Sequence, residues 1–479
     1  MDARGVRGIE GTGRFRAELG PMLVLAIPVV VAELGWMAMG LVDTAIVGRL
    51  GPGAVGIEAI DAVGLGSSLY IAVVIFGLGL MLGLDTMIAQ EHGAGRHEDA
   101  RRSLAQGAYL ALVLAPLSMG ALWGLIPLLP RWGFRPAVLG PMVPYLRVLA
   151  WSVPPLLIFG AFRRYLQAVE VVRPITVALV SANVVNAVAC WALVYGRLGC
   201  PALGVVGAGW ATDLARVYMM VVLLASFAIW GRGPLPNPFR RWPAIEPRRL
   251  ARLLALGWPA SLQVGLEVCV FAAATALAGR LDATSQAAHQ IVLNVSGMTF
   301  MVPLGVAAAG AVRVGQAVGR GDARGASTAG WTALAIGAAF MTVSGVGLLV
   351  GSRSVVALFT ADEAVAATSA RLFLIAAAFQ LFDGVQVVAT GVLRGVGDTR
   401  SPMLCNIVAH WGIGLPLGYV LAFPLGRGVL GLWVGLSAGL VLAGFVNLGT
   451  WARRARRLDR EPAAPAGRPP VAVGAPGVL

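Results

Sequence analysis

The sequence GPMLVLAIPVVVAELGWMAMGLV, residues 20–42, is the first long apolar run of the chain. A helix needs about 20 mainly apolar residues to cross the hydrocarbon core of a bilayer, and this run meets that requirement. Runs of similar length and composition follow one another along most of the chain. They predict twelve membrane-spanning helices, at residues 20–42, 55–85, 103–127, 142–168, 174–197, 203–230, 248–279, 285–315, 326–350, 364–393, 401–424 and 428–452.

The composition of the whole chain favours a membrane protein. Of the 479 residues, 58% are hydrophobic and 13% are charged, whereas about 25% of the residues of an ordinary soluble protein are charged. So few charges cannot cover a water-soluble surface of this size, and so hydrophobic a chain cannot be disordered over most of its length. We therefore predict an all-α polytopic membrane protein in a lipid bilayer. Its four cysteines are scattered without metal-ligand spacing, so neither a metal site nor a cofactor is expected.

An internal repeat divides the chain into two halves. The segment Pro28–Ile60 aligns with Pro259–Ile291 without a gap, and the Q-x-x-G motif at 90–93 recurs at 316–319. Each half contains six predicted spans, so both halves enter the membrane in the same direction. Such halves are related by a pseudo-two-fold axis along the membrane normal, and many transporters with this plan build a central site between two rocking lobes.

Five segments follow from the spans and the repeat. An N-lobe of six spans is joined to a C-lobe of six spans by a linker rich in Pro and Arg. The residues after the last span are rich in Pro, Ala and Gly, and we expect them to be disordered. The predicted segments are a cytoplasmic N-terminal segment at 1–19, the N-lobe at 20–230, a cytoplasmic linker at 231–247, the C-lobe at 248–452 and a cytoplasmic tail at 453–479.

The positions of the arginines predict the orientation. All 37 basic residues are Arg; 27 of them lie at the termini and in the even-numbered loops, and seven lie in the odd-numbered loops. Basic residues accumulate on the cytoplasmic side of membrane proteins. We therefore predict both termini to be cytoplasmic, in a multi-pass protein of the cell's inner (cytoplasmic) membrane. The same distribution accounts for the net charge of +14 without nucleic acid as a partner.

Three carboxylates in the predicted spans are candidates for ion binding. Glu267 and Asp383 lie well inside spans seven and ten, and Asp43 lies in the outer part of span one. An ionisable group at the bilayer centre costs at least about 2.5–3.5 kcal/mol, so it is retained where it faces a cavity, pairs or binds an ion. A buried carboxylate that takes up a cation or a proton links that event to conformation.

Other polar residues in the spans have both structural and functional interpretations. Asp213 lies three residues before Arg216, a spacing that favours an ion pair on one helix face. Glu33 remains open between the two interpretations. His289 and Gln290, at the start of span eight, either bind substrate or have a structural role.

Motifs for nucleotide-driven transport and for catalysis are lacking in the sequence. The glycines at 77–83 resemble a nucleotide loop, but they lie in an apolar run of membrane length, where small residues serve helix packing. No Walker A sequence occurs, so transport has to draw on an ion gradient or be passive. No nucleophile–base or metal-ligand set favours an intramembrane enzyme, and we predict that the protein is not an enzyme.

Several motifs resemble those of one known family. The stretch VDTAIVGRLG at 42–51 is similar to the first-span signature of the multidrug and toxic compound extrusion (MATE) family, in particular its NorM-like branch. AHQ at 288–290 resembles the eighth span of that family, and FDGVQ at 382–386 resembles its tenth span. The resemblance extends from about residue 20 to residue 452.

The resemblance implies a Na⁺- or H⁺-coupled antiporter that exports bulky, often cationic, organic compounds by alternating access. The family's C-lobe cation site uses a seventh-span Glu and a tenth-span Asp, which correspond to Glu267 and Asp383. Its N-lobe site uses the Asp of the V-D-T motif, Asp43, with a fifth-span Asn, Asn186. Members often carry a further Asn four residues later, where this chain has Cys190, so Asn183 is the alternative ligand.

The resemblance also concerns helix shape and the cavity. Pro28 matches a first-span proline that the family associates with bending of that helix, and proline disrupts helix geometry in general. We expect a monomer. The candidate substrate or cavity residues are Glu33, His289, Gln290 and Gln386.

A lipid-linked saccharide flippase of the same superfamily is the main alternative. Such a protein is expected to have cationic residues in its cavity for a pyrophosphate group. The intramembrane charges of this chain are mainly acidic, with Arg216 as the main exception, so antiport is the favoured prediction.

Overall fold

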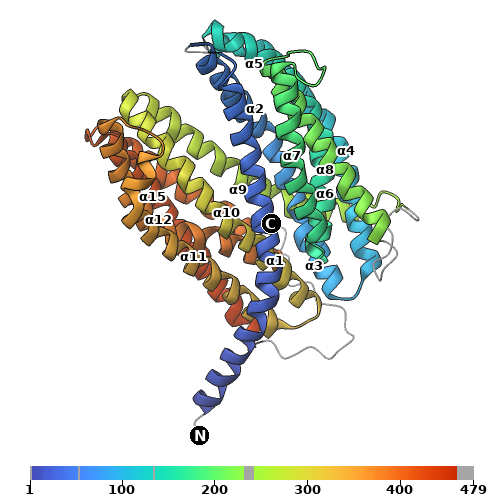
Figure 1. Cartoon of the computed structure of the whole chain (residues 1–479). Helices are drawn as coiled ribbons and strands as arrows, with labels where there is room; N and C mark the ends of the chain where they lie inside the picture. The colour runs from blue at the N-terminus through green and yellow to red at the C-terminus, as the bar shows by residue number, and fades with distance from the viewer. Residues whose placement is uncertain (1–2, 52–53, 133–134, 231–241, 461–479) are drawn as a thin grey trace.

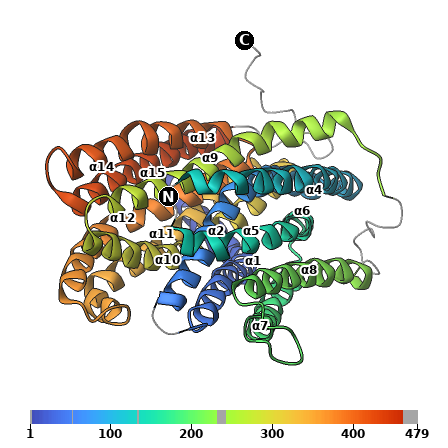
Figure 2. The same ribbon diagram turned by 90° about the horizontal axis from the view of Figure 1, so that it is seen from above.

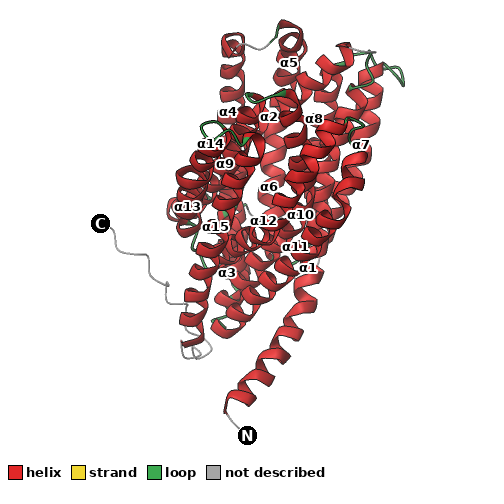
Figure 3. Cartoon of the chain, turned by 90° about the vertical axis from the view of Figure 1, so that its left-hand side faces the viewer, coloured by secondary structure: helices red, strands yellow, loops and turns green. Residues whose placement is uncertain are grey.

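The computed structural model describes residues 3–51, 54–132, 135–230 and 242–460. Helices, joined by turns and loops, account for these residues, and the described part of the chain contains no strand (Figure 3). Twelve of its helical segments are long and apolar enough to cross a membrane. The prediction of an all-α protein with twelve spans is therefore confirmed.

The helices fall into two groups that lie side by side, as Figures 1 and 2 show. The first six spans form the N-lobe and the last six form the C-lobe. In the N-lobe the helices are α1 (Ala3–Val47), α2 (Ala54–Met81), α3 (Gly83–Gly93), α4 (His97–Leu125), α5 (Pro136–Leu149), α6 (Val153–Ala168), α7 (Arg173–Tyr195) and α8 (Val205–Trp230), with short 3₁₀ segments η1 (Ile126–Trp132) and η2 (Ala150–Ser152). In the C-lobe they are α9 (Pro247–Gly279), α10 (Ala283–Gly319), α11 (Ala323–Ala357), α12 (Glu363–Gly395), α13 (Arg400–Asn406), η3 (Ile407–Gly414), α14 (Leu415–Ala422) and α15 (Gly428–Arg460).

The ends of the chain differ in extent from the sequence prediction. The predicted N-terminal segment is helical from Ala3, as part of α1. Helix α15 continues to Arg460, so the first residues of the predicted tail extend the last span. The rest of that tail, at 461–479, and most of the predicted linker, at 231–241, lie outside the described residues.

Three spans are interrupted where the sequence predicts continuous helices. The second span divides into α2 and α3 at Leu82. The fourth span changes to the 3₁₀ segment η2 just before Pro154 and Pro155, and these prolines have no N–H to continue an α-helical ladder. In the eleventh span the π-helix η3 separates α13 from α14, and π-helical turns of this kind recur at functional sites.

Aspartates begin three consecutive helices of the C-lobe. Asp282, Asp322 and Asp362 each precede a helix and accept hydrogen bonds from backbone N–H groups of its first turn, at 2.8 Å in each case. Such capping satisfies donors that have no partner within the helix. The hydroxyl and N–H of Ser285 also lower the pKa of the Asp282 carboxyl in the loop between two spans, which favours its ionised form. These caps fix where α10, α11 and α12 start.

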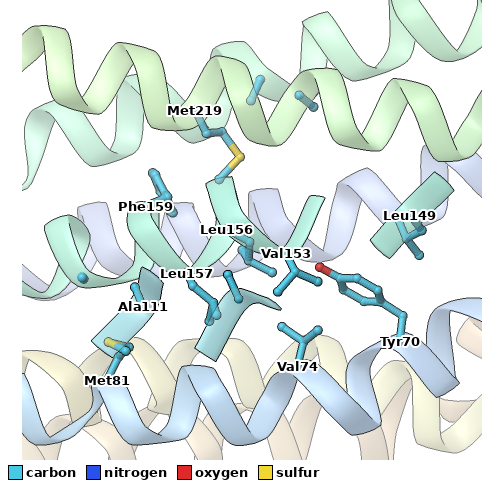
Figure 4. Packing of buried hydrophobic residues seen from close by; sticks show 14 of the residues in the cluster. Tyr70, Val74, Met81, Ala111, Leu149, Val153, Leu156, Leu157, Phe159 and Met219 are labelled. Atoms are coloured by element: carbon cyan, nitrogen blue, oxygen red, sulfur yellow. The ribbon is translucent and has the colours of Figure 1, made fainter. Parts of the chain in front are cut away.

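A continuous apolar core holds the N-lobe together. Figure 4 shows Tyr70 and Val74 of α2 against residues of α6, with Met219 of α8 on the opposite side of α6. Because lipid tails are as apolar as these side chains, van der Waals packing between them, and not removal from water, keeps these helices in fixed positions.

Helix α1 takes part in two separate apolar cores. Its residues Met22–Val29 pack in a cluster with α10, α11 and α12 of the C-lobe. Ala32, Met39 and Val47 belong to the N-lobe core. The helix runs through Pro28 without interruption, so the predicted bending at Pro28 stays a prediction.

The two lobes meet at one end of the bundle, which we call the closed end; it contains the turns at 94–96, 169–172, 320–322 and 396–399. Here Arg249 of α9 binds Glu91 at 2.5 Å and Asp99 at 3.0 Å. Arg313 of α10 binds Glu18 at 2.7 Å and Glu170 at 2.8 Å. These ion pairs join elements that belong to different lobes.

The repeated Q-x-x-G motifs pack against each other at the closed end. A Cβ on Gly93 would collide with the backbone of Gln316, and a Cβ on Gly319 would collide with the backbone of Gln90. Each motif thus lies on the backbone of its counterpart, as a two-fold relation between the halves requires. The glycines at 77–83 also serve packing, because Gly79 lies against Ser261 and Gly83 against Leu253.

Candidate ion-coupling site

The N-lobe holds Asp43 in a pocket of hydrogen-bond donors. The carboxylate is 5% exposed. One oxygen accepts from Nδ2 of Asn186 on α7 at 2.9 Å, and the other accepts from Oγ1 of Thr212 on α8 at 3.0 Å. The structure therefore brings together Asp43 and Asn186, which the sequence analysis paired.

The second hydrogen-bond donor to Asp43 is Thr212, which the sequence analysis missed. Cys190 lies beside the carboxylate, at the position where the sequence resemblance implies a further Asn. Asn183, the alternative ligand, instead donates to the carbonyl of Leu179, one turn back on its own helix. Thr212 could have been suspected, because it is a hydroxyl residue next to an acidic residue inside an apolar span.

A second polar group lies nearby in the N-lobe, around Arg216. The guanidinium is 8% exposed, donates to the hydroxyls of Tyr70 and Ser152, and lies 4.6 Å from the centre of the Tyr70 ring. Asp213 is 5% exposed, and neither of its oxygens has a hydrogen-bond partner among the described residues. The predicted ion pair between Asp213 and Arg216 is therefore not formed in this conformation.

In the C-lobe, Glu267 of α9 and Asp383 of α12 lie in the same region of the bundle, near enough for the charge of Glu267 to act on Asp383. Among the described residues, no Arg lies within ion-pair distance of either carboxylate, and neither accepts a hydrogen bond. Glu33, Asp85 and Glu91 each pair with an Arg, so the acidic pair of Glu267 and Asp383 differs from them in having no basic partner.

Further acceptor atoms lie one helical turn from the acidic pair. Gln386 follows Asp383 by three residues on α12; it is buried, and its Oε1 has no donor within the described structure. Gln263 precedes Glu267 by four residues and donates to Thr390 Oγ1 at 3.5 Å, and Asn447 donates to the same hydroxyl at 3.3 Å. Residues at these spacings share a helix face. Surplus oxygen acceptors suit a monovalent cation or a proton.

Glu33 and His289 have partners of their own. Glu33 of α1 pairs with the buried Arg163 of α6. The ring of His289 is fully buried; its Nδ1 accepts from Nε1 of Trp433 at 3.0 Å, and its Nε2 lies 2.9 Å from Oγ1 of Thr275. Both ring nitrogens are therefore occupied, which favours the structural interpretation of His289. Gln290 is exposed.

Replacing Trp433 by Phe tests the role of His289. The change keeps an aromatic ring at this position but removes the donor to Nδ1 and some packing volume. Loss of one hydrogen bond costs about 0.5–1.5 kcal/mol, more where an acceptor is left buried and unpaired. We expect a lower temperature of thermal unfolding in detergent and unchanged affinity for organic cations. A large change in affinity with no change in stability would instead place His289 in a substrate site.

A surface groove of about 530 Å³ lies away from these sites. It is lined by Trp123, Ile126, Pro127, Arg147 and Trp151. None of the predicted ion or substrate residues belongs to it.

Comparisons with known proteins agree with the fold and the repeat. The family model MatE matches residues 28–192 and 259–420, one segment in each lobe. "Probable multidrug resistance protein NorM" of Mesorhizobium japonicum is 38% identical over 92% of this chain and 95% of its own. "Multidrug resistance protein PmpM" of Pseudomonas aeruginosa is 35% identical over 94% of both chains.

Solved structures of similar fold include two transporters. The eukaryotic MATE transporter AtDTX14 superimposes with a TM-score of 0.82 and 20% identity, over 93% of this chain and 99% of its own. An outward-facing multidrug resistance MATE family transporter superimposes with a TM-score of 0.83 and 20% identity, over 93% and 97%. The structural likeness concerns the fold alone, whereas the family match and the identities above 30% concern the sequence. The chain belongs to the MatE family of multidrug transporters, and it is not an enzyme.

Proposed function

We propose that the protein is a Na⁺- or H⁺-coupled antiporter that exports bulky, often cationic, organic compounds by alternating access, in the inner membrane and as a monomer. The acidic pair Glu267 and Asp383 carries this proposal. Two carboxylates without a cation beside them attract a small cation, a proton or a cationic organic compound. Because all of these ligands are positive, occupancy by one of them weakens binding of another. Antiport requires this competition, because the coupling ion and the substrate have to exclude each other from the same transporter.

The arrangement of the lobes supports the alternating-access part of the proposal. Ion pairs and backbone contacts join the lobes at the closed end. If the arginine-rich side is cytoplasmic, the closed end faces the cytoplasm, and this conformation is outward-facing. An ion that binds one conformation more tightly shifts the equilibrium toward it by that difference in affinity. Ion entry from outside would then release substrate and allow the lobes to close outside and open inside.

Transport in proteoliposomes tests the proposal. The purified protein is reconstituted, a fluorescent cationic dye is supplied, and a Na⁺ gradient and a pH gradient are imposed in separate experiments. We expect dye movement under one of the two gradients, reversed when the gradient is reversed. Dye movement that is equal with and without both gradients would contradict coupled antiport.

A further inference from the structure

The N-lobe contains more buried acid than buried base. Asp43 of α1 and Asp213 of α8 are both buried, and both interact electrostatically with Arg216. Among the described residues neither carboxylate forms an ion pair, and Arg216 is the basic residue whose charge reaches both. With all three groups ionised, the cluster would carry one uncompensated negative charge. A buried charge of this kind costs several kcal/mol, and such a group takes up a proton instead.

Hydrogen bonding distinguishes the two carboxyls. Asp43 accepts from Asn186 and Thr212, and both bonds favour an ionised carboxylate. Among the described residues neither oxygen of Asp213 accepts a hydrogen bond, and the nearby hydroxyl of Ser152 donates to the carbonyl of Leu149. The neutral form is therefore favoured at Asp213.

The position of Arg216 fits a neutral Asp213. At a spacing of three residues on one helix, an ionised Asp213 and Arg216 lie within reach of each other. The guanidinium instead binds Tyr70 of α2 and Ser152 of η2 and so ties α8 to two other elements. The remaining titratable groups facing this cluster are Tyr145 of α5, which binds Ser67, and Cys190 of α7, which lies beside Asp43. Neither supplies a second positive charge.

We propose that Asp213 is a proton-binding group of the N-lobe, separate from the acidic pair of the C-lobe. Loss of its proton would draw Arg216 from Tyr70 and Ser152 to Asp213 and loosen the attachment of α8 to α2 and η2. The role in transport rests on the proposed function, whereas the bound proton does not. The proton comes from water on one side of the membrane and returns to water when the carboxyl ionises.

Infrared spectroscopy tests the bound proton without requiring transport. The protein carries Glu267→Gln and Asp383→Asn, so the C-lobe pair contributes no carboxyl signal, and the spectrum is followed across a pH titration. We expect a carboxyl C=O band at the high frequency typical of a group without hydrogen bonds, which disappears as the pH rises. Asp213→Asn removes this band, and Asp213→Glu retains it at a changed frequency. If Asp213→Asn does not fold, Asp213→Ser gives the same test.

Thr212→Val is the matched control, because it removes a donor from Asp43 and leaves Asp213 unchanged. An unmoved band in Thr212→Val supports the assignment to Asp213. A band that shifts in Thr212→Val, or one that persists in Asp213→Asn, overturns it.

A transport measurement separates this inference from the proposed function. In a chain with the C-lobe pair intact, Asp213→Asn is expected to lower pH-gradient-driven dye movement by about 5–150-fold, the usual range of coupling between sites. If the wild-type protein moves no dye but the infrared band behaves as expected, the proposed function fails and the proton site stands. If dye movement is coupled but the band survives Asp213→Asn, the proton site at Asp213 fails and the proposed function stands.

Discussion

Glu267→Gln and Asp383→Asn are each expected to reduce strongly the gradient-driven export of a cationic dye from proteoliposomes. Both changes keep the shape of the side chain and remove its negative charge. Since the two carboxylates have no basic partner in the described structure, removing one leaves no orphaned cation behind, and folding is expected to survive. The remaining carboxyl then binds a cation without the help of a second charge. We expect gradient-driven movement to fall by about 100-fold, near the upper limit of ordinary coupling between sites.

A control for this prediction lies on the same helix as Asp383. Glu363→Gln removes an exposed carboxylate at the first turn of α12 and is expected to leave dye movement unchanged. Thermal unfolding of all three variants shows whether loss of transport follows from loss of fold. Full coupled transport in both Glu267→Gln and Asp383→Asn would contradict the assignment of the acidic pair as the coupling site.

Gly93→Ala and Gly319→Ala are expected to shift the protein out of the conformation described here. An added Cβ meets the backbone of Gln316 or Gln90, and backbone atoms cannot rotate away as a side chain can. Overpacking of this kind costs about 1–3 kcal/mol. Because the contact exists only while the closed end is closed, that cost changes the ratio of the two conformations by about 5–150-fold. Distances between probes attached at Arg96 and Arg324, exposed residues of different lobes, are expected to lengthen.

Gly120→Ala provides the matched control for these glycine changes. A Cβ at this position of α4 meets no atom within 4 Å, so the change alters helix propensity without altering a contact. The probe distances are expected to be the same as in the wild type. Unchanged distances in both Gly93→Ala and Gly319→Ala would show that the closed end separates at other contacts.

The sequence predicted features that depend on length, periodicity and repetition. Twelve apolar runs gave the twelve spans, because the thickness of the bilayer sets the length of each helix. The Q-x-x-G repeat gave the two-fold relation that places Gly93 on Gln316 and Gly319 on Gln90. The carboxylates of interest stood out because ionised groups are rare in apolar runs.

Features that depend on contacts between distant residues were not accessible from the sequence. The pairing of Glu33 with Arg163 depends on how α1 crosses α6, and the burial of His289 between Thr275 and Trp433 depends on how α15 packs on α10. Sequence spacing suggested an ion pair at Asp213, yet Arg216 binds a tyrosine and a serine from other helices. The π-helix at 407–414 has no local sequence signature comparable to that of a proline or a cap.

Because α1 packs in two separate cores, it connects the two lobes mechanically. Met22–Val29 are held by the C-lobe and Ala32 onward by the N-lobe, so any rotation of one lobe relative to the other applies torque within α1. Pro28 lies next to the short interval between the two attachments, and it has no N–H to donate to the carbonyl of Val24, so the helix has one fewer hydrogen bond to resist bending there. Helix α1 therefore bends most easily next to the interval across which the two lobes pull on it.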